Sequence, residues 1–577
     1  MNTINNDLNS YDAIVVGTGI SGGWAAKELC ENGLKTLVLE RGPMVKHVED
    51  YPTAHLDPWD MPNGGKATQE IIDRKPKQHR TGYTTHAARE HFFVDDLKHP
   101  YNENKRFDWI RGYQVGGRSL MWGRQSYRLS DIDFGANKKD GIAVDWPIRY
   151  KDIEKWYDKV EEYIGVSGEN LGLKQFPDQK LLKPMNLNCV EEVLKEKLAT
   201  NFDDGRLLTI GRVAHITEGT KPGEGRSTCQ YRNRCMRGCP YGAYFSSNSS
   251  TLPAADATGN MTLRPNSIVH EVIYDDVTKK ATGVRLIDAE TKESLVYNAK
   301  VIFLCASTMA SASILLQSKS ERFPNGLGND SGELGHNIMD HHFHVGASAK
   351  AIGFDDKYVK GRRPNGIYIP RFRNLGGNTE AETFKRGYGY QGGASRSSTS
   401  ELVAELKYGP ELKEAILKPG EWNVNLLAFG ETLPDHKNKL FLDYDKKDEW
   451  GLPTVTFDAA FGENEMAMRK DMQEQAVRML TEAGFEDVNG YDNRDNMAMG
   501  LGIHEMGTAR MGSNPKTSVL NGNNQVHACD NVYVTDGSFM TSSGCQNPSL
   551  TYMAFTARAA NYAAAELKKI TLKLGTI

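Results

Sequence analysis

The stretch Tyr11-Asp-Ala-Ile-Val-Val-Gly-Thr-Gly-Ile-Ser-Gly22 decides the fold of this chain. Its first six residues form a short β-branched run, which is typical of a buried strand. Glycines follow at positions 17, 19 and 22, and a helix is expected to begin near Gly22 and to end at Asn32-Gly33. A second apolar run, residues 35–40, then ends in an acid. The pattern predicts two parallel strands joined by a right-handed helical crossover.

This spacing is a nucleotide-binding fingerprint. The early glycines allow a tight turn, the next lets the backbone approach a pyrophosphate, and the helix N-terminus points unpaired N–H groups at its charge. Glu40, eighteen residues after Gly22, is placed to accept hydrogen bonds from a ribose. A glycine-rich surface turn does not explain that acid. We therefore expect Gly17, Gly19, Gly22, Glu40 and Arg41 to contact a dinucleotide, either FAD or NAD.

Bulk composition is that of a large enzyme. A chain of 577 residues exceeds what one hydrophobic core usually organises, so two domains are expected. The net charge is −4 and charged residues make up 25%, which argues against nucleic acid or an anionic membrane as a partner. The longest apolar stretch, residues 301–316, is too short and too polar to span a bilayer. The first residues carry no pattern of a secretory signal.

The C-terminal part carries the second motif. His504-Glu-Met-Gly-Thr is followed by Asp536-Gly537 and, forty-three residues after the histidine, by Asn547-Pro548. Together with the fingerprint, this block resembles the glucose–methanol–choline oxidoreductase family. Further matching segments lie at both ends and in the middle of the chain: residues 111–119, 301–317, 335–341 and 504–557.

The resemblance implies an α/β fold with a Rossmann-type FAD-binding domain and a discontinuous α+β substrate domain built on an antiparallel sheet. The implied FAD-binding domain comprises residues 10–50, 105–145, 225–345 and 500–570. Residues 51–104 would form a lid or connecting segment, and residues 146–224 and 346–499 the substrate domain.

The resemblance also assigns cofactor contacts. Asp536 and Gly537 would lie beside the flavin pyrophosphate and ribityl chain, and Asn547-Pro548 beside the isoalloxazine. The pair Gly116-Gly117 would let the backbone approach the ring, with Ser119 next to it. Met121 stands where a relative, pyranose 2-oxidase, carries a histidine bonded to flavin, so FAD is expected to be held non-covalently.

Residue types in the C-terminal block fit alcohol oxidation. The reaction needs a base for the hydroxyl proton while a hydride leaves the same carbon. An imidazole has an ordinary pKa of about 6.5, so neutral His504 is a competent base. Asn547 cannot take a proton, but its amide can hold the substrate oxygen. His341, His342 and His344 lack a recognisable zinc spacing and are interpreted as structural.

Three of the eight cysteines, Cys229, Cys235 and Cys239, lie within eleven residues. Such thiolates can converge on one inorganic centre, and neighbouring arginines would lower the pKa of the thiols. Zinc usually needs a fourth protein ligand, and a disulfide would leave one thiol over. The spacing also resembles flavin subunits of bacterial sugar dehydrogenases that carry a [3Fe–4S] cluster. That resemblance implies a dehydrogenase that passes electrons to a cytochrome, quinone or dye.

For the substrate, the resemblance favours a secondary hydroxyl of a pyranose sugar or glycoside, with C3 of glucosides first. The alternatives are a glucose 1-dehydrogenase or gluconate dehydrogenase flavin subunit, or a pyranose oxidase using O2. Polar and aromatic residues between Tyr368 and Tyr390 are expected to bind the sugar. Related flavoproteins are exported folded with a small partner subunit, which implies the periplasm; the cytoplasm is the alternative.

Overall fold

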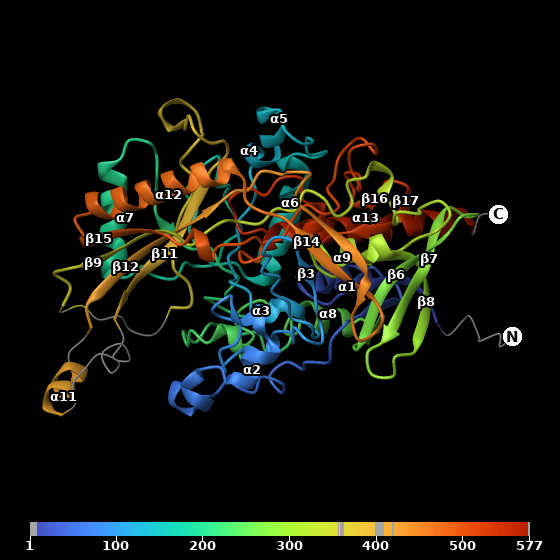
Figure 1. Cartoon of the computed structure of the whole chain (residues 1–577), viewed down its shortest axis with the longest axis horizontal. Helices are drawn as coiled ribbons and strands as arrows, with labels where there is room; N and C mark the ends of the chain where they lie inside the picture. Colours follow the sequence, from blue (N-terminus) through green and yellow to red (C-terminus); the bar gives the residue numbers. More distant parts are fainter. Residues whose placement is uncertain (1–8, 356, 358–362, 398–408, 418–419, 575–577) are drawn as a thin grey trace.

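The computed structural model describes residues 9–355, 357, 363–397, 409–417 and 420–574. Two lobes lie side by side, and both chain ends lie on the lobe drawn at the right of Figure 1. That lobe carries a mainly parallel sheet, whereas the left lobe carries an antiparallel one. The α/β class predicted from the sequence, with a Rossmann-type domain and an antiparallel substrate sheet, is confirmed.

The first sheet is built on the glycine-rich stretch. Its strand order is β16-β17-β8-β1-β2-β5, and β7 pairs with β8 and with β6. The strands are β1 (Ser10–Val16), β2 (Thr36–Leu39), β5 (Met261–Arg264), β6 (Ser267–Asp275), β7 (Lys280–Asp288), β8 (Ser294–Leu304), β16 (Gln525–Val526) and β17 (Cys529–Val534). All four residues of β2 are buried, as expected for a parallel strand covered on both faces.

Helices cover this sheet. The predicted helix is α1, which packs against α13 and α8. The helices of this lobe are α1 (Ile20–Glu31), α8 (Thr251–Asp256), α9 (Thr308–Gln317) and α13 (Ser549–Leu574). The apolar stretch at 301–316 is thus the end of a buried strand and a helix. None of the helices in the described ranges is long and apolar enough to cross a membrane.

The second sheet has six strands in the order β15-β9-β12-β11-β10-β4. They are β4 (Thr209–Ile210), β9 (Val345–Ala351), β10 (Ile367–Ile369), β11 (Tyr388–Arg396), β12 (Trp422–Gly430) and β15 (Glu486–Asp492). Alternate residues of β12 are buried, which is the pattern of a strand with one face on a core. Helix α12 (Glu463–Glu482) supplies that core through Met468, Met472 and Met479, which recur at helical spacing.

Other segments connect the two sheets. A small sheet pairs β13 (Lys439–Lys447) with β14 (Pro453–Asp458) and β14 with β3 (Asn102–Glu103). Helix α6 (Tyr150–Ile164) packs against α13, while α7 (Cys189–Asn201) packs against α12. The shorter helices are α2 (Gln69–Arg74), α3 (Pro76–His79), α4 (Asp131–Phe134), α5 (Ala136–Asp140) and α11 (Pro410–Leu417). Residues 146–224 therefore contact both lobes, although the sequence assigns them to the substrate domain.

Candidate active site

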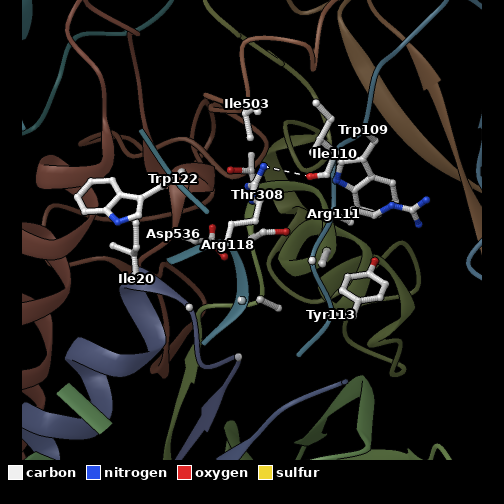
Figure 2. Close-up of a pocket in the computed structure, with 18 of the residues that line it drawn as sticks. Ile20, Trp109, Ile110, Arg111, Tyr113, Arg118, Trp122, Thr308, Ile503 and Asp536 are labelled. Atoms are coloured by element: carbon white, nitrogen blue, oxygen red, sulfur yellow. Dashed lines mark hydrogen bonds between the residues drawn. The ribbon is translucent and has the colours of Figure 1, made fainter. Parts of the chain in front are cut away.

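A cavity of about 760 Å³ is lined by residues of both lobes, by the loop 109–125 and by β14. Its volume is in the range of cofactor and ligand sites. The fingerprint, the loop 111–119 and the C-terminal block all reach it, although they lie far apart in the sequence. Figure 2 shows Ile20, Arg118 and Asp536 from these segments around the space, together with Thr308 of α9.

The three fingerprint glycines have two different roles. Gly17 has φ +99°, and a Cβ there would lie 2.4 Å from the carbonyl oxygen of Cys305. A Cβ on Gly22 would lie 1.9 Å from the oxygen of Gly17. Gly19, by contrast, has nothing within 4 Å of its Cβ position and lines the cavity. Gly17 and Gly22 therefore close the turn, whereas Gly19 leaves room for a phosphate.

Glu40 lies at the end of β2, where three donor groups from two residues hold its carboxylate. It accepts from the N–H and the hydroxyl of Thr18, at 3.1 and 2.5 Å, and from the N–H of Gly42 at 3.1 Å. Burial raises the pKa of Glu40, and these hydrogen bonds oppose the rise. The Arg41 guanidinium lies 4.9 Å from the ring centre of Tyr113. Thr18, Glu40, Arg41 and Tyr113 line the cavity, whereas Gly42 does not.

The glycine pair of the loop meets the fingerprint turn directly. The N–H of Gly116 donates to the Thr18 hydroxyl at 2.9 Å, and a Cβ on Gly117 would lie 3.3 Å from Cα of Gly19. The Ser119 hydroxyl donates to the carbonyl of Gly116 at 2.6 Å. Gly117 and Ser119 line the cavity, while Gly116 lies behind them. Two turns from distant parts of the sequence thus form one backbone wall.

The next residue of this loop, Arg118, ties it to the C-terminal block. Its guanidinium donates to both oxygens of Glu505, at 3.0 and 2.9 Å. It also donates to the carbonyl of Ile110 at 3.2 Å (Figure 2). A bidentate pair of this kind fixes orientation as well as charge. The sequence prediction did not include this ion pair, which fixes the residue next to His504.

Asp536 and Gly537 lie where β17 ends and both line the cavity. The Asp536 carboxylate accepts from the hydroxyl of Ser311 at 2.5 Å and from the N–H of Ser538 at 3.0 Å. Burial raises its pKa. Pro548 is buried just outside the cavity, where its carbonyl accepts from the N–H of Tyr552 at 3.0 Å in the first turn of α13. The structure therefore brings all the expected cofactor residues to the cavity or directly behind its wall.

His504 and Asn547 face each other across the cavity. The Asn547 amide nitrogen lies 3.1 Å from Nε2 of His504. The amide oxygen of Asn547 accepts from Nε2 of Gln391 at 2.8 Å. All three side chains line the cavity. Gln391 comes from β11 of the substrate sheet, and no sequence signal indicated it.

The other nitrogen of His504 contacts His341. Its Nδ1 lies 2.8 Å from Nδ1 of His341, whose Nε2 lies 2.7 Å from the carbonyl oxygen of Gly544. Desolvation by burial lowers the pKa of His504 well below its ordinary value, and His341 and Arg118 lower it further. His341, which belongs to the segment 335–341, was expected to be structural. Its contact with the ring of His504 was not predicted from the sequence.

Asp340 holds the loop that carries His504. Its carboxylate accepts from the N–H groups of Gly500, Gly502 and His504, at 2.8, 2.8 and 3.0 Å, and from that of His341 at 2.9 Å. Burial and the charge of Glu505 raise the pKa of Asp340 to about 7, against the pull of these donors. The neighbours Asp340 and His341 therefore have different contacts. The Asp340 carboxylate binds backbone N–H groups, and the His341 ring contacts the side chain of His504.

The wall beside His504 is aromatic. Phe343 and Phe429 stack with their ring centres 5.1 Å apart, and Phe429 lies 6.4 Å from the His504 ring. Gln125 and Arg124 also line the large cavity, and Arg124 lies near His215 and Cys235. The cavity therefore combines an apolar face with hydrogen-bond donors and acceptors.

The expectation that polar and aromatic residues between Tyr368 and Tyr390 bind the sugar is wrong, because no residue of this described segment lines the large cavity. Tyr368, Tyr388 and Tyr390 are buried in the substrate lobe. The hydroxyl of Tyr388 donates to Asp471, and that of Tyr390 donates to the carbonyl of Met472 at 2.6 Å. Both acceptors belong to α12, so these two hydroxyls point away from the cavity.

The three clustered cysteines line a second, small cavity together with His215 and several arginines. All three are free thiols, and Nε2 of His215 lies 3.5 Å from Sγ of Cys235. Burial raises the pKa of Cys229 to about 11 and also raises that of Cys235. In the described part of the chain, no three His, Cys, Asp or Glu side chains converge as the ligands of one metal ion.

Two family models, both described as GMC oxidoreductase, match residues 11–343 and 434–556. A 2-methyl-1,2-propanediol dehydrogenase from Mycolicibacterium austroafricanum is 28% identical, over 96% of this chain and 94% of the relative. The fructose dehydrogenase large subunit of Gluconobacter japonicus is 26% identical, over 98% of this chain and 100% of the relative. The crystal structure of pyridoxine 4-oxidase from Mesorbium loti shares the fold, with a TM-score of 0.59 at 16% identity over 96% of this chain and 98% of that one.

These matches span both ends of the chain and include every segment that lines the large cavity except parts of the substrate lobe. The chain belongs to the GMC oxidoreductase family and is an FAD-dependent enzyme that oxidises CH–OH groups.

Proposed function

We propose that the protein is a dehydrogenase that oxidises a secondary hydroxyl of a pyranose sugar or glycoside, with C3 of glucosides favoured. The observation that carries this proposal is the 3.1 Å pairing of His504 and Asn547 inside the cavity that the nucleotide fingerprint also lines. A base and an amide donor then face the same space as the cofactor wall.

The two side chains divide the work on the substrate hydroxyl. Neutral His504 takes the hydroxyl proton on Nε2, and its lowered pKa keeps it neutral at physiological pH. The Asn547 amide N–H holds the same oxygen as negative charge develops on it. Gly19, Gly117 and Asp536 would hold FAD, which would supply the acceptor for the hydride that leaves the carbon. Met121 in the wall is consistent with FAD held non-covalently.

A sugar fits the composition of the wall. The stacked rings of Phe343 and Phe429 offer an apolar face of the kind on which a pyranose ring packs, and Gln125, Arg124 and Gln391 can bind its hydroxyls. The fructose dehydrogenase relative, by its name, acts on a sugar. Glucose oxidised at C1, gluconate oxidation and a pyranose oxidase using O2 remain the alternatives within this class.

A short branched diol is the second candidate. Ile503, Phe343 and Phe429 make the wall nearest His504 strongly apolar. The relative with 28% identity is, by its name, a dehydrogenase of 2-methyl-1,2-propanediol, whose branched end would suit such a wall. This candidate uses the same base and amide and differs in what occupies the rest of the cavity.

Electrons are proposed to leave through a [3Fe–4S] cluster on Cys229, Cys235 and Cys239. The three thiols line one cavity, and a cluster of several irons holds its cysteines further apart than a single metal ion does. The ring nitrogen Nδ1 of His215, buried beside them, has no hydrogen-bond partner within the described residues. Such a cluster would accept the two electrons of the reaction one at a time.

The position of the cysteine turn supports that route. The turn η5 (Cys235–Arg237) lies between the two cavities: Cys235 lines the small one and Met236 lines the large one. Tyr231 and Tyr241, each 39% exposed, lie on the outer side of the same segment. We propose that a cytochrome or another acceptor docks there. A small subunit that carries the protein to the periplasm is the partner that the resemblance implies, with the cytoplasm as the alternative.

The test is a visible spectrum of anaerobically purified protein with three compounds in turn: methyl glucoside, glucose and 2-methyl-1,2-propanediol. Bleaching of the oxidised flavin by methyl glucoside, which is blocked at C1, is the expected result and supports oxidation away from C1. Bleaching by glucose alone would move the assignment to C1, and bleaching by the diol alone would select the second candidate. A flavin that none of the three bleaches would overturn both.

A further inference from the structure

A continuous chain of hydrogen bonds runs from the carbonyl of Gly544 to the side chain of Gln391. It passes through His341, His504 and Asn547, with distances of 2.7, 2.8, 3.1 and 2.8 Å. Its members come from four separate parts of the sequence: His341, Gln391, His504 and the segment that holds Gly544 and Asn547. The central one, His504, is the proposed base.

Chemistry fixes the direction of the first two bonds. A carbonyl oxygen can only accept, so Nε2 of His341 must carry the proton that it donates to Gly544. A neutral imidazole carries one N–H, so Nδ1 of His341 is a lone pair that accepts. The facing Nδ1 of His504 must then be the donor. That leaves Nε2 of His504 as the unprotonated nitrogen, which is the atom facing Asn547 and the cavity.

This assignment requires His341 to be neutral, and its surroundings meet that condition. Burial lowers the pKa of His341 to about 4, with the bond to Gly544 opposing. The charged groups nearest the pair are Arg118, Glu505 and Asp340. Glu505 is neutralised by the bidentate contact of Arg118, and Asp340 directs its oxygens to backbone N–H groups. No carboxylate is therefore bonded to either imidazole to favour its charged form.

The backbone at this crossing is held by Asp340. The ring of His341 is fully buried, and both of its nitrogens are used, one on Gly544 and one on His504. A residue needed only for packing would not have to present an acceptor to the base.

We propose that His341 is a positioning residue that holds His504 in the tautomer with its proton on Nδ1 and its lone pair on Nε2. The inference deepens the proposed function and rests on His504 being the base. Without the acceptor, the buried Nδ1–H of His504 would be unpaired, and the inactive tautomer, with the proton on Nε2, would gain population. A lost buried partner of this kind corresponds to about 10- to 100-fold in the fraction of competent enzyme.

Two substitutions separate the roles of the two nitrogens. In His341→Asn the amide oxygen takes approximately the place of Nδ1 and can still accept from His504. In His341→Gln the amide nitrogen takes approximately the place of Nε2 and can still donate to Gly544, but no acceptor faces His504. The two variants are therefore matched in polarity and opposite in the atom they preserve.

The experiment measures anaerobic flavin reduction by stopped flow, using whichever of methyl glucoside, glucose and 2-methyl-1,2-propanediol bleaches the wild type fastest. We expect the limiting rate constant of His341→Asn to stay within about fivefold of the wild type. That of His341→Gln should fall about 10- to 100-fold with its half-saturation concentration unchanged. Flavin content and melting temperature, measured on the same samples, show whether each variant is folded.

The proposal would be overturned if the rate constants of His341→Asn and His341→Gln fell equally or if both stayed at the wild-type value. It would also be overturned if His341→Asn were the slower variant. If the Gln variant purifies without flavin, His341→Ala is tested instead, because added imidazole can fill the space left by the His341 ring. Flavin reduction that imidazole restores supports the proposal, and flavin reduction that imidazole does not restore contradicts it. His504→Ala is the separate control for the base. If His504→Ala reduces its flavin at the wild-type rate, the proposed function itself is refuted. If His504→Ala is slow but the two His341 variants have equal rate constants, only the present inference is refuted.

Discussion

The side chain of Gln391 donates to the amide oxygen of Asn547 at 2.8 Å, and this bond joins the antiparallel sheet to the proposed catalytic pair of His504 and Asn547. Gln391 lies on β11, whereas Asn547 lies two residues before the helix α13. Because the oxygen of Asn547 is occupied, its amide nitrogen must point to His504. The antiparallel lobe therefore determines which end of the Asn547 amide points to the proposed base.

Replacing Gln391 by Glu is expected to reverse the Asn547 amide. A carboxylate accepts, so it would draw the amide nitrogen and turn the Asn547 oxygen toward the lone pair of His504. We expect the limiting rate of anaerobic flavin reduction to fall at least about tenfold below that of Gln391→Met, which only loses the bond. The limiting rate of Gln391→Met itself should be about 2- to 10-fold below that of the wild type, which corresponds to the loss of one hydrogen bond. A Glu variant as fast as the Met variant would contradict the assigned orientation.

Two fingerprint glycines should respond differently to alanine. Gly19→Ala meets open space in the protein, so the apoprotein should keep its stability within about 0.5 kcal/mol. The added methyl group would occupy the path of the pyrophosphate, so FAD affinity should fall at least about tenfold.

Gly17→Ala is the matched control. Its φ of +99° and the 2.4 Å approach to the Cys305 oxygen should destabilise the fold itself by at least about 2 kcal/mol. Thermal unfolding of the apoprotein and FAD titration distinguish the two effects. If Gly19→Ala binds FAD as tightly as the wild type, this glycine does not face the cofactor.

Cysteine substitution tests the proposed electron route. Cys235→Ser should remove most of the iron and the electron paramagnetic resonance signal of anaerobically purified protein. Flavin reduction by substrate should stay within about threefold, because the base and the amide are untouched, while reduction of an added cytochrome or dye should fall at least about tenfold.

The control for this test is Cys189→Ser, at the start of α7 and outside the small cavity. It should keep both iron and dye reduction. Iron-free wild-type protein with full dye reduction would refute the cluster.

The sequence predicted the parts of the site that depend on local spacing. Gly17, Gly22 and Glu40 lie in one βαβ unit, so their roles follow from a turn, a helix start and the end of the next strand. His504 and Asn547 were found through their motif and their separation. The contact between His341 and His504 was not predicted, because it joins residues 163 positions apart in the sequence through a buried hydrogen bond.

The tyrosines of β11 show why the substrate wall was mispredicted. Side chains alternate along a strand, so Tyr388 and Tyr390 share the face that packs on α12, while Gln391 lies on the opposite face and reaches the cavity. Composition indicated a polar, aromatic segment but could not tell which face met the core. Only the packing of α12 against the sheet decides that.

The most direct test of this account is the rate of anaerobic flavin bleaching in the wild type and in His504→Ala, measured with the compound that bleaches the wild type fastest. We predict that His504→Ala binds FAD normally and that its flavin bleaches about 10²- to 10⁴-fold more slowly, as expected for loss of a general base. Bleaching at the wild-type rate in His504→Ala would contradict the assignment of His504 as the base.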